Sequence, residues 1–138
     1  MTLTKTHRAY FDAAASVAKL SDFHRIKIGC AVIYKHKIIS SGYNSNKSNP
    51  LQKKLNKYRF DEDSTHSLHA ETQALLPLIG RRDIDFSHVQ LYMCRMYKDG
   101  SLAPCRPCPS CMALIRRLGI RHIYYTNDNS YVYEELIY

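Results

Sequence analysis

Apolar positions recur at helical spacing near the start of the chain and in β-branched runs soon after. Over residues 5–20 the apolar side chains fall three or four positions apart, and Thr4 stands where an N-cap would, so a helix is expected. Two β-branched runs, 27–34 and 38–44, flank the polar turn 35–37. This pattern predicts an antiparallel hairpin.

The next stretch has no sustained period. Residues 45–66 contain Pro50 together with several Asn and Ser, and they are expected to form a long loop with one short helical turn at most. A loop of that length in a compact domain is more often functional than not. A short helix is predicted over 69–79, ended by Gly80.

The rest of the chain predicts a strand at 88–97, a helix at 111–119 and a strand at 120–126. The order α-β-β-α-β-α-β indicates one α/β domain over residues 1–138, with three α/β/α layers and a mixed sheet of four to five strands. A parallel strand needs a crossover of about a dozen residues or more. Residues 127–138 are too few for one, so they supply at most a strand that returns antiparallel.

Composition bears on partners and compartment. The 138 residues carry 20 Lys and Arg against 12 Asp and Glu, a net charge of +8, which favours polyanions such as nucleic acid. The sequence shows no signal peptide and no run long enough to span a membrane. Five cysteines without an export signal are typical of metal ligands or redox thiols, and a cytoplasmic location is expected.

Three of those cysteines, Cys105, Cys108 and Cys111, form two overlapping PCxxC motifs. If Cys105 opened the following helix, Pro107 and Pro109 would lie inside its first turns, where a proline costs about 3 kcal/mol or more. If Cys108 opens the helix, both prolines fall at its start, where their missing N–H groups are not needed. Cys108 and Cys111 are therefore paired, and their i, i+3 spacing places both thiols on one helix face.

A tetrahedral metal site needs further ligands, and the stretch LHAE supplies His69 and Glu71 at the start of the other helix. Two thiolates and a neutral imidazole balance the charge of Zn²⁺ and leave one position for water, as in a catalytic site. The helix dipole at Cys108 favours its thiolate. Glu71, two residues beyond His69, is placed to exchange protons with that water.

HxE followed by PCxxC resembles the zinc-dependent nucleobase deaminases. The chain is similar to the cytidine and deoxycytidylate deaminase superfamily over most of its length, in the segments IGCAVI, IISSGYN, HAETQAL and PCPSCMALIRRLGIRHIYY. The resemblance implies a cytidine-deaminase-like fold with two zinc-ligating helices on one face of the sheet. It also implies hydrolytic conversion of cytosine to uracil.

The resemblance assigns roles by position. His69, Cys108 and Cys111 would bind one catalytic Zn²⁺, and Glu71 would be the proton shuttle. Asn44 of the GYN stretch would contact the sugar or the base, unless it is a plain turn residue. The neighbouring residues expected to line the substrate site are Tyr43 and Ala70.

Other interpretations of the cysteines stay open. Cys105 would close a structural zinc site if it joined Cys108, Cys111 and His69, although it is more simply a spare thiol on the loop. A redox CxxC would leave Glu71 without a role. His66 is a competing ligand, but only His69 has the HxE spacing. Cys30 and Cys94 lie in apolar strand runs and are expected to be small buried hydrophobes.

The expected antiparallel end of the chain resembles the free-cytidine enzymes and compact bacterial toxin deaminases. The deoxycytidylate, tRNA-adenosine and antiviral editing enzymes carry a helix and a parallel strand there. His69, however, stands where the free-cytidine enzymes usually have cysteine. The sequence HAETQAL also lacks the asparagine that commonly follows HAE in deoxycytidylate deaminases.

The stretch 47–59 is basic and has no acid. Cations that follow phosphates and rings that stack bases are what a single strand requires, although a solvated charged loop is nearly as simple an explanation. Cytosine in single-stranded nucleic acid, DNA above RNA, is therefore the expected substrate, with a free deoxycytidine nucleotide second and a non-catalytic zinc-containing nucleic-acid-binding module third. The residues expected to contact the strand are Lys53, Lys54, Lys57, Tyr58, Arg59 and Tyr125.

Overall fold

The computed structural model describes residues 1–23, 26–58 and 67–138. Helix α1 (Lys5–Ala18) begins at Thr4, whose hydroxyl accepts a hydrogen bond of 3.1 Å from the backbone N–H of His7. Its inner face buries Phe11, Ala14 and Ala18. The expected first helix is thus confirmed, although it ends two residues earlier than the sequence pattern predicts.

A five-stranded sheet forms the centre of the molecule, in the order β2-β1-β5-β6-β7. Among the described strands only the β5–β6 pair is parallel; β1 pairs antiparallel with both β2 and β5, and β7 returns antiparallel against β6. The predicted hairpin, the mixed sheet and the antiparallel return are all confirmed. The strands are β1 (Lys27–Tyr34), β2 (Lys37–Tyr43), β5 (Gln90–Met96), β6 (His122–Asn127) and β7 (Ser130–Glu135).

The predicted loop over 45–66 is wrong in its described part, which is largely regular structure. The elements are β3 (Ser45–Ser48), α2 (Pro50–Leu55), the 3₁₀ helix η1 (Asn56–Tyr58) and β4 (Ser67–Leu68). Asn49 caps α2 by accepting hydrogen bonds from the N–H groups of Leu51 and Gln52, and Leu55 is buried in the core. These elements are too short to show a period, and β3 is stabilised by pairing with the distant β4.

The two helices that carry the HAE and PCxxC motifs differ from their predicted bounds. Helix α3 (Ala70–Leu75) is shorter than predicted, because the chain tightens at Pro77 into η2 (Leu76–Leu78). A further 3₁₀ turn, η3 (Phe86–His88), precedes β5. Helix α4 (Pro109–Leu118) starts after Cys108, so the PCxxC register chosen from the prolines is confirmed.

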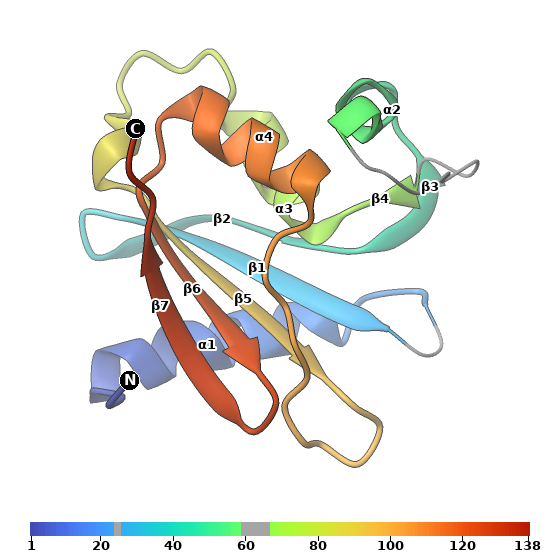
Figure 1. Cartoon of the computed structure of the whole chain (residues 1–138), viewed down its shortest axis with the longest axis vertical. Coiled ribbons are helices and arrows are strands. Elements are labelled where there is room, and N and C mark those ends of the chain that lie inside the picture. The colour runs from blue at the N-terminus through green and yellow to red at the C-terminus, as the bar shows by residue number, and fades with distance from the viewer. Residues whose placement is uncertain (24–25, 59–66) are drawn as a thin grey trace.

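The sheet separates two helical layers. Figure 1 shows α1 on one face, with α2, α3 and α4 on the other. Alternate strand residues follow this division: Ala31 and Ile33 pack with Phe11 on the α1 side, whereas Cys30 and Val32 belong to the core beneath α3 and α4. This is the three-layer α/β/α arrangement expected from the element order. No helix among the described residues is both long and apolar enough to cross a membrane.

Close packing places α3 directly on the sheet. A Cβ atom at Gly42 of β2 would lie 2.5 Å from the carbonyl oxygen of Ala70 and 2.6 Å from the amide nitrogen of Ala74. Real Cβ atoms do not approach backbone so closely, so glycine is required for this contact. The start of α3, which bears the HAE motif, is therefore held firmly against the sheet.

Candidate metal centre and catalytic pocket

Two helices begin at one point above the sheet. His69 is the N-cap of α3 and Cys108 is the N-cap of α4, and the side chain of neither residue caps its own helix. Both side chains are thereby directed away from their helices, toward each other. Cys111 lies in the first turn of α4, three residues after Cys108, so its thiol joins that of Cys108 on the same face.

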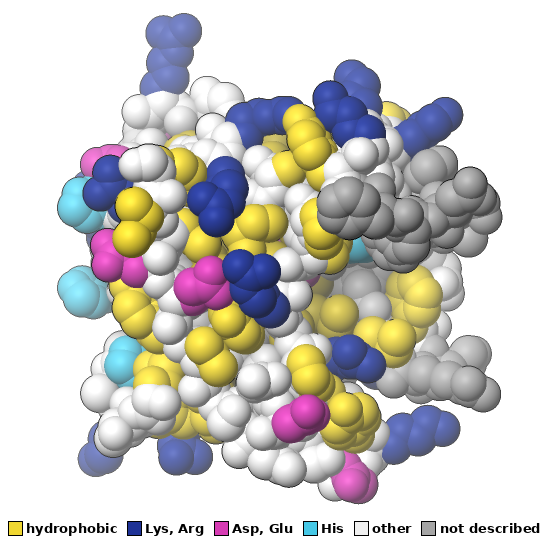
Figure 2. Space-filling view, in the orientation of Figure 1, with side chains coloured by type: hydrophobic (Ala, Val, Ile, Leu, Met, Phe, Trp, Pro, Cys, Tyr) yellow, Lys and Arg dark blue, Asp and Glu magenta, His cyan; other side chains and the backbone are white. Residues whose placement is uncertain are grey.

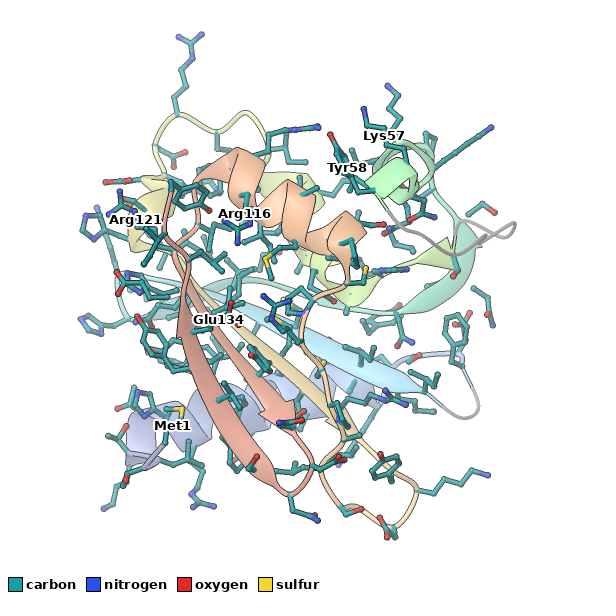
Figure 3. All side chains as sticks on the ribbon, in the orientation of Figure 1. Met1, Lys57, Tyr58, Arg116, Arg121 and Glu134 are labelled. Carbon is teal, nitrogen blue, oxygen red and sulfur yellow. The ribbon has the colours of Figure 1, made fainter. Side chains whose placement is uncertain are left out.

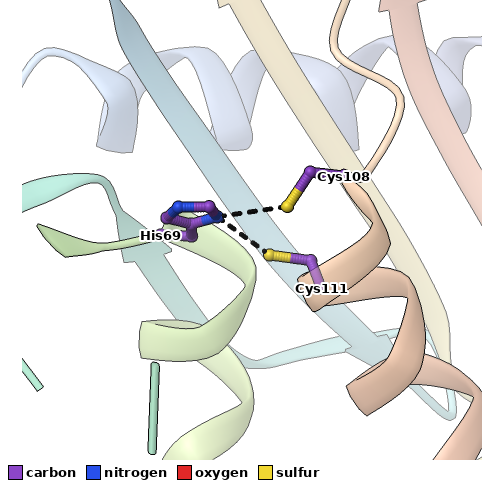
Figure 4. A group of neighbouring side chains, drawn as sticks. All are labelled: His69, Cys108 and Cys111. Carbon is purple, nitrogen blue, oxygen red and sulfur yellow. Dashed lines mark hydrogen bonds between the residues drawn. The ribbon is translucent and has the colours of Figure 1, made fainter. Parts of the chain in front are cut away.

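The three side chains form a compact donor set (Figure 4). His69 Nδ1 lies 3.2 Å from Cys111 Sγ and 3.4 Å from Cys108 Sγ, and the three donor atoms lie within 4.8 Å of one another. Tetrahedral zinc with ordinary Zn–N and Zn–S lengths separates such atoms by about 3.6–3.8 Å. The two distances from His69 Nδ1 to the sulfurs are therefore within a few tenths of an ångström of zinc-binding geometry, and the set of one imidazole and two thiols fits one Zn²⁺.

The two thiols differ in acidity because they share a hydrogen bond. That bond lowers the pKa of Cys108 to about 3, with help from His69. The same bond, together with burial, raises the pKa of Cys111 well above its ordinary value. A metal that binds both sulfurs takes them as thiolates, so metal binding is coupled to the release of protons.

Glu71 lies in the first turn of α3 and is buried, with 6 % of its surface exposed. Burial is the main reason why its pKa is raised above the ordinary value, and the nearby His69 offsets part of that effect. A carboxyl group with a raised pKa is suited to accept and return a proton near neutral pH. Glu71 is not among the three donor residues that gather for a metal.

Two members of the donor set, His69 and Cys108, line a cavity of about 380 Å³. Ala70 and Glu71 line the same cavity. An apolar wall is formed by Phe23, Ile26 and Ile28, and the cations in the lining are Arg95 and Arg106. A concave site with a few convergent polar groups and a perturbed carboxyl is typical of an active site for a small ligand.

Asn44 lines this cavity as expected, but both ends of its amide already bind the backbone. Its Oδ1 accepts from the N–H of Ile28 at 2.9 Å, and its Nδ2 donates to the carbonyl of Ile26 at 2.8 Å. Asn44 therefore ties the end of β2 to the start of β1, at the apolar wall. Its contact with a sugar or base remains a prediction.

Several of the predicted substrate contacts lie elsewhere. Tyr43 is outside the lining, and its N–H donates to Gln73 Oε1 at 2.7 Å. Tyr125 is buried in the core, where its hydroxyl donates to Glu134 Oε1 at 2.9 Å. Arg59 lies outside the described residues.

The basic residues of α2 and η1, namely Lys53, Lys54 and Lys57, do not line the cavity, and neither does Tyr58. Figure 3 shows Lys57 and Tyr58 on the outer side of the helical layer. The Lys57 Nζ lies 5.1 Å from the centre of the Tyr58 ring. Figure 2 shows Lys and Arg side chains gathered over the same layer. Within the described chain this is an outer basic surface, separate from the pocket wall.

Sequence reasoning missed the two cavity arginines. Arg106 stands between Cys105 and Cys108 in the CRPC motif, a position that would have identified it as a neighbour of the site. Arg95 gave no such signal, because it is one residue of a strand. Its Nη1 donates to the carbonyl of Pro104 at 3.4 Å, which places it against the loop that carries Arg106.

The other cysteines agree with their expected roles. Cys30 and Cys94 are buried in the core, and burial raises the pKa of Cys94 to about 11. Cys105 is buried too, and burial raises its thiol pKa well above the ordinary value. It lines the cavity but stays outside the donor set that gathers around His69.

Comparison with known proteins agrees with a zinc site formed by His69, Cys108 and Cys111. The family model described as "Cytidine and deoxycytidylate deaminase zinc-binding region" matches residues 4–127. A search among curated proteins found no match.

Solved structures share the fold at low sequence identity. The dCMP deaminase from the cyanophage S-TIM5 in apo form superposes with a TM-score of 0.64 at 22 % identity, over 91 % of this chain and 86 % of that one. The same enzyme in complex with dCMP and dUMP gives a TM-score of 0.62 at 20 % identity, over 91 % and 83 % of the two chains. A cytidine deaminase from Burkholderia pseudomallei gives 0.63 at 18 % identity, over 98 % and 93 %.

Proposed function

The chain belongs to the cytidine and deoxycytidylate deaminase family, and on that premise we propose that it hydrolyses the exocyclic amine of cytosine in a free deoxycytidine nucleotide. One observation carries this proposal: two of the three metal donors, His69 and Cys108, line one cavity of about 380 Å³ together with Glu71 and two arginines. The volume is that of a small-ligand site. The arginines supply positive charge where a phosphate attached to the substrate would lie.

In the reaction the oxygen of water bonds to C4 of cytosine, the bond from C4 to the exocyclic nitrogen breaks, and ammonia leaves to give uracil. His69, Cys108 and Cys111 would hold the zinc, which when bound supplies Lewis-acid activation of a water molecule. Glu71 takes a proton from that water and delivers it to the departing amine. The apolar wall of Phe23, Ile26 and Ile28 limits solvent around the base.

The two arginines act at the other end of the substrate. Guanidinium groups bind phosphate through paired hydrogen bonds, and they keep their charge at any pH at which the protein is folded. Arg95 and Arg106 come from different segments, β5 and the loop before α4. Together they suit a terminal phosphate that enters the same cavity as the base.

A single-stranded polynucleotide is the second candidate. It is favoured by the outer basic surface of α2 and η1, where the ring of Tyr58 is 41 % exposed beside Lys57. The cavity lining changes the order of the two substrates that the sequence suggested, because the lysines of this surface stand outside it. The two candidates share the chemistry and differ in where the phosphates bind.

The deciding experiment offers zinc-loaded protein three substrates in separate reactions: deoxycytidine, deoxycytidine monophosphate and an oligonucleotide with one cytosine. Mass spectrometry measures the mass gain of about 1 Da when an amine becomes a carbonyl oxygen. Glu71→Gln is the control for contaminating deaminases. Conversion of the monophosphate far ahead of the other two is expected. Preferred conversion of the oligonucleotide would refute the free-nucleotide assignment, and no conversion of any of the three would refute cytosine deamination.

A further inference from the structure

A buried amide outside the cavity lining connects the two halves of the metal centre. Gln52 of α2 is fully buried, with 0 % of its surface exposed. Its Oε1 accepts a hydrogen bond of 3.1 Å from the backbone N–H of His69. Burying a polar side chain costs desolvation free energy unless the side chain forms hydrogen bonds. The hydrogen-bond partner of Gln52 here is the backbone of a metal donor, His69.

The other end of the same amide leads to the second helix. Gln52 Nε2 donates to Asn56 Oδ1 at 2.9 Å, and that oxygen also accepts from the hydroxyl of Ser110 at 3.1 Å. Ser110 is itself fully buried and lies on α4 between Cys108 and Cys111. A continuous chain of three hydrogen bonds thus runs from His69 to the helix that carries both thiols.

This chain joins segments that are far apart in the sequence. His69 is 42 residues from Cys111, and the connection between them is made by side chains from α2 and η1, which lie earlier in the chain than either. Leu55 anchors α2 in the core through apolar contacts of its own. Substitutions that remove the chain of hydrogen bonds therefore leave in place the apolar contacts by which Leu55 packs α2 against the core.

We propose that Gln52 and Asn56 are positioning residues, which set the separation of His69 from Cys108 and Cys111 and so tune the affinity of this site for a divalent metal. The proposal rests on the donor set and is independent of the substrate. Partners that orient metal ligands from outside the coordination shell change metal affinity by about 10- to 100-fold when removed. The effect arises because a donor set held near its bound geometry loses less freedom on binding.

The test measures zinc affinity in the full-length protein by competition with a chromophoric chelator. Gln52→Leu and Asn56→Leu remove the polar chain, and Ser110→Ala removes one hydroxyl from it. Asn56→Asp keeps an oxygen that accepts from both Gln52 and Ser110, so it is the conservative rescue. Asn49→Ala is the matched control, because it removes the cap of the same helix α2, including a hydrogen bond to the backbone of Gln52, and removes none of the three side-chain hydrogen bonds of the chain. The melting temperature of each metal-free variant reports on folding separately.

The two leucine variants are expected to weaken zinc binding by about 10- to 100-fold, and Ser110→Ala by about 2- to 10-fold, the cost of one hydrogen bond. Asn56→Asp is expected to bind zinc within about 3-fold of the wild-type protein, since the hydrogen bonds from Gln52 and Ser110 are kept. The absorption spectrum of the Co²⁺-substituted protein should change in the leucine variants and not in Asn49→Ala.

The proposal is overturned if Asn49→Ala loses as much zinc affinity as the leucine variants at an equal loss of melting temperature. It is also overturned if Asn56→Asp binds zinc as poorly as Asn56→Leu. Should a leucine variant fail to fold, Ser110→Ala and Asn56→Asp still decide, because both retain the shape of the core. A protein that deaminates none of the substrates tried above would leave these affinities, and this inference, unaffected.

Discussion

The guanidinium of Arg106 forms two parallel hydrogen bonds with the carboxylate of Glu134, from Nε to Oε1 and from Nη2 to Oε2, each 3.0 Å long. Arg106 belongs to the pocket wall, and Glu134 belongs to β7, the last strand of the sheet. Tyr125 of the neighbouring β6 donates to the same carboxylate. The antiparallel return of the chain therefore has a role at the pocket, since it orients one of the two cavity cations.

Replacing Arg106 by alanine is expected to raise KM for deoxycytidine monophosphate by about 10- to 100-fold, the value of one charged hydrogen-bonding group, and to change kcat little. The reason is that the guanidinium is proposed to bind phosphate and to take no part in proton transfer. Steady-state kinetics with the monophosphate and with deoxycytidine measure the effect. KM for deoxycytidine should not change, because that substrate has no phosphate. An equal rise in KM for both substrates would contradict the phosphate-binding role of Arg106. Arg117→Ala is the matched control, because Arg117 contacts Tyr58 on the outer surface.

The Arg106–Glu134 pair also predicts how stability depends on pH. The hydrogen bonds from Arg106 hold the pKa of Glu134 below its ordinary value of 4.5. A carboxyl whose folded pKa is lowered stabilises the fold above its unfolded pKa, and this contribution is lost as the pH falls through the folded pKa. Because the side chain of Arg106 is 53 % exposed, the pair contributes about 1 kcal/mol at most.

Urea unfolding of the metal-free protein and of Glu134→Gln measures that contribution. The difference in the free energy of unfolding should be present at pH 7 and should shrink progressively below about pH 4.5. Metal-free protein is used throughout, so that loss of zinc at low pH does not enter. A difference that stays constant across this range would show that the pair adds nothing to stability through its charge.

Glu71→Gln is expected to lower kcat by about 10²- to 10⁴-fold, the usual contribution of a positioned acid–base group, while one equivalent of zinc stays bound. Glutamine keeps the shape of the side chain but cannot carry the proton. Turnover is measured together with the zinc content of the same preparation. A variant that loses its metal as well as its activity would place Glu71 among the ligands instead.

Cysteine substitutions distinguish the open site from a closed structural one. Cys111→Ala is expected to abolish stoichiometric zinc binding, because it removes one of three donors. Cys105→Ala should keep one zinc per chain, since Cys105 stands outside the donor set. Elemental analysis after gel filtration gives both values. Loss of zinc from Cys105→Ala would favour the four-ligand alternative.

Gly42→Ala tests the contact that places α3 on the sheet. The added methyl group meets the backbone of Ala70 and Ala74, so α3 must shift, at a cost of about 1–3 kcal/mol. Because α3 begins at His69, zinc affinity should fall as well. Gly29→Ala is the control: its Cβ would clash with the backbone of Ala14 on the opposite face of the sheet. It should lower stability without a comparable loss of affinity for zinc.

Local rules were enough to pair Cys108 with Cys111 and to predict most of the sheet, whereas the resemblance to the deaminases joined His69 to them. The prolines at 107 and 109 decided which cysteines pair, because a helix tolerates them only at its start. The antiparallel return of β7 followed from the small number of residues left for a crossover. Both inferences use constraints that act between residues no more than about a dozen positions apart. Such constraints can be recognised in a sequence without its structure.

The structure of residues 45–58 and the direction of the α2 lysines depend on contacts between segments that are distant in the sequence. Strand β3 forms because it pairs with β4. The short helix α2 is stabilised by the burial of two of its own side chains, Gln52 and Leu55. The lysines of α2 were expected at the pocket because they are basic and precede the HAE helix. Their actual direction is set by which face of α2 is buried, and six residues are too few to show that face as a period.

The two metal donors His69 and Cys108 stand at the N-caps of α3 and α4, and their own carbonyls accept the first hydrogen bonds of those helices, from Gln73 and Met112. A cation that joins the two side chains therefore also fastens two helix ends that have no side-chain cap of their own. Amide hydrogen exchange should register this directly. Removing the metal would speed exchange first in the opening turns of α3 and α4, while the central strands β1 and β5 keep their protection.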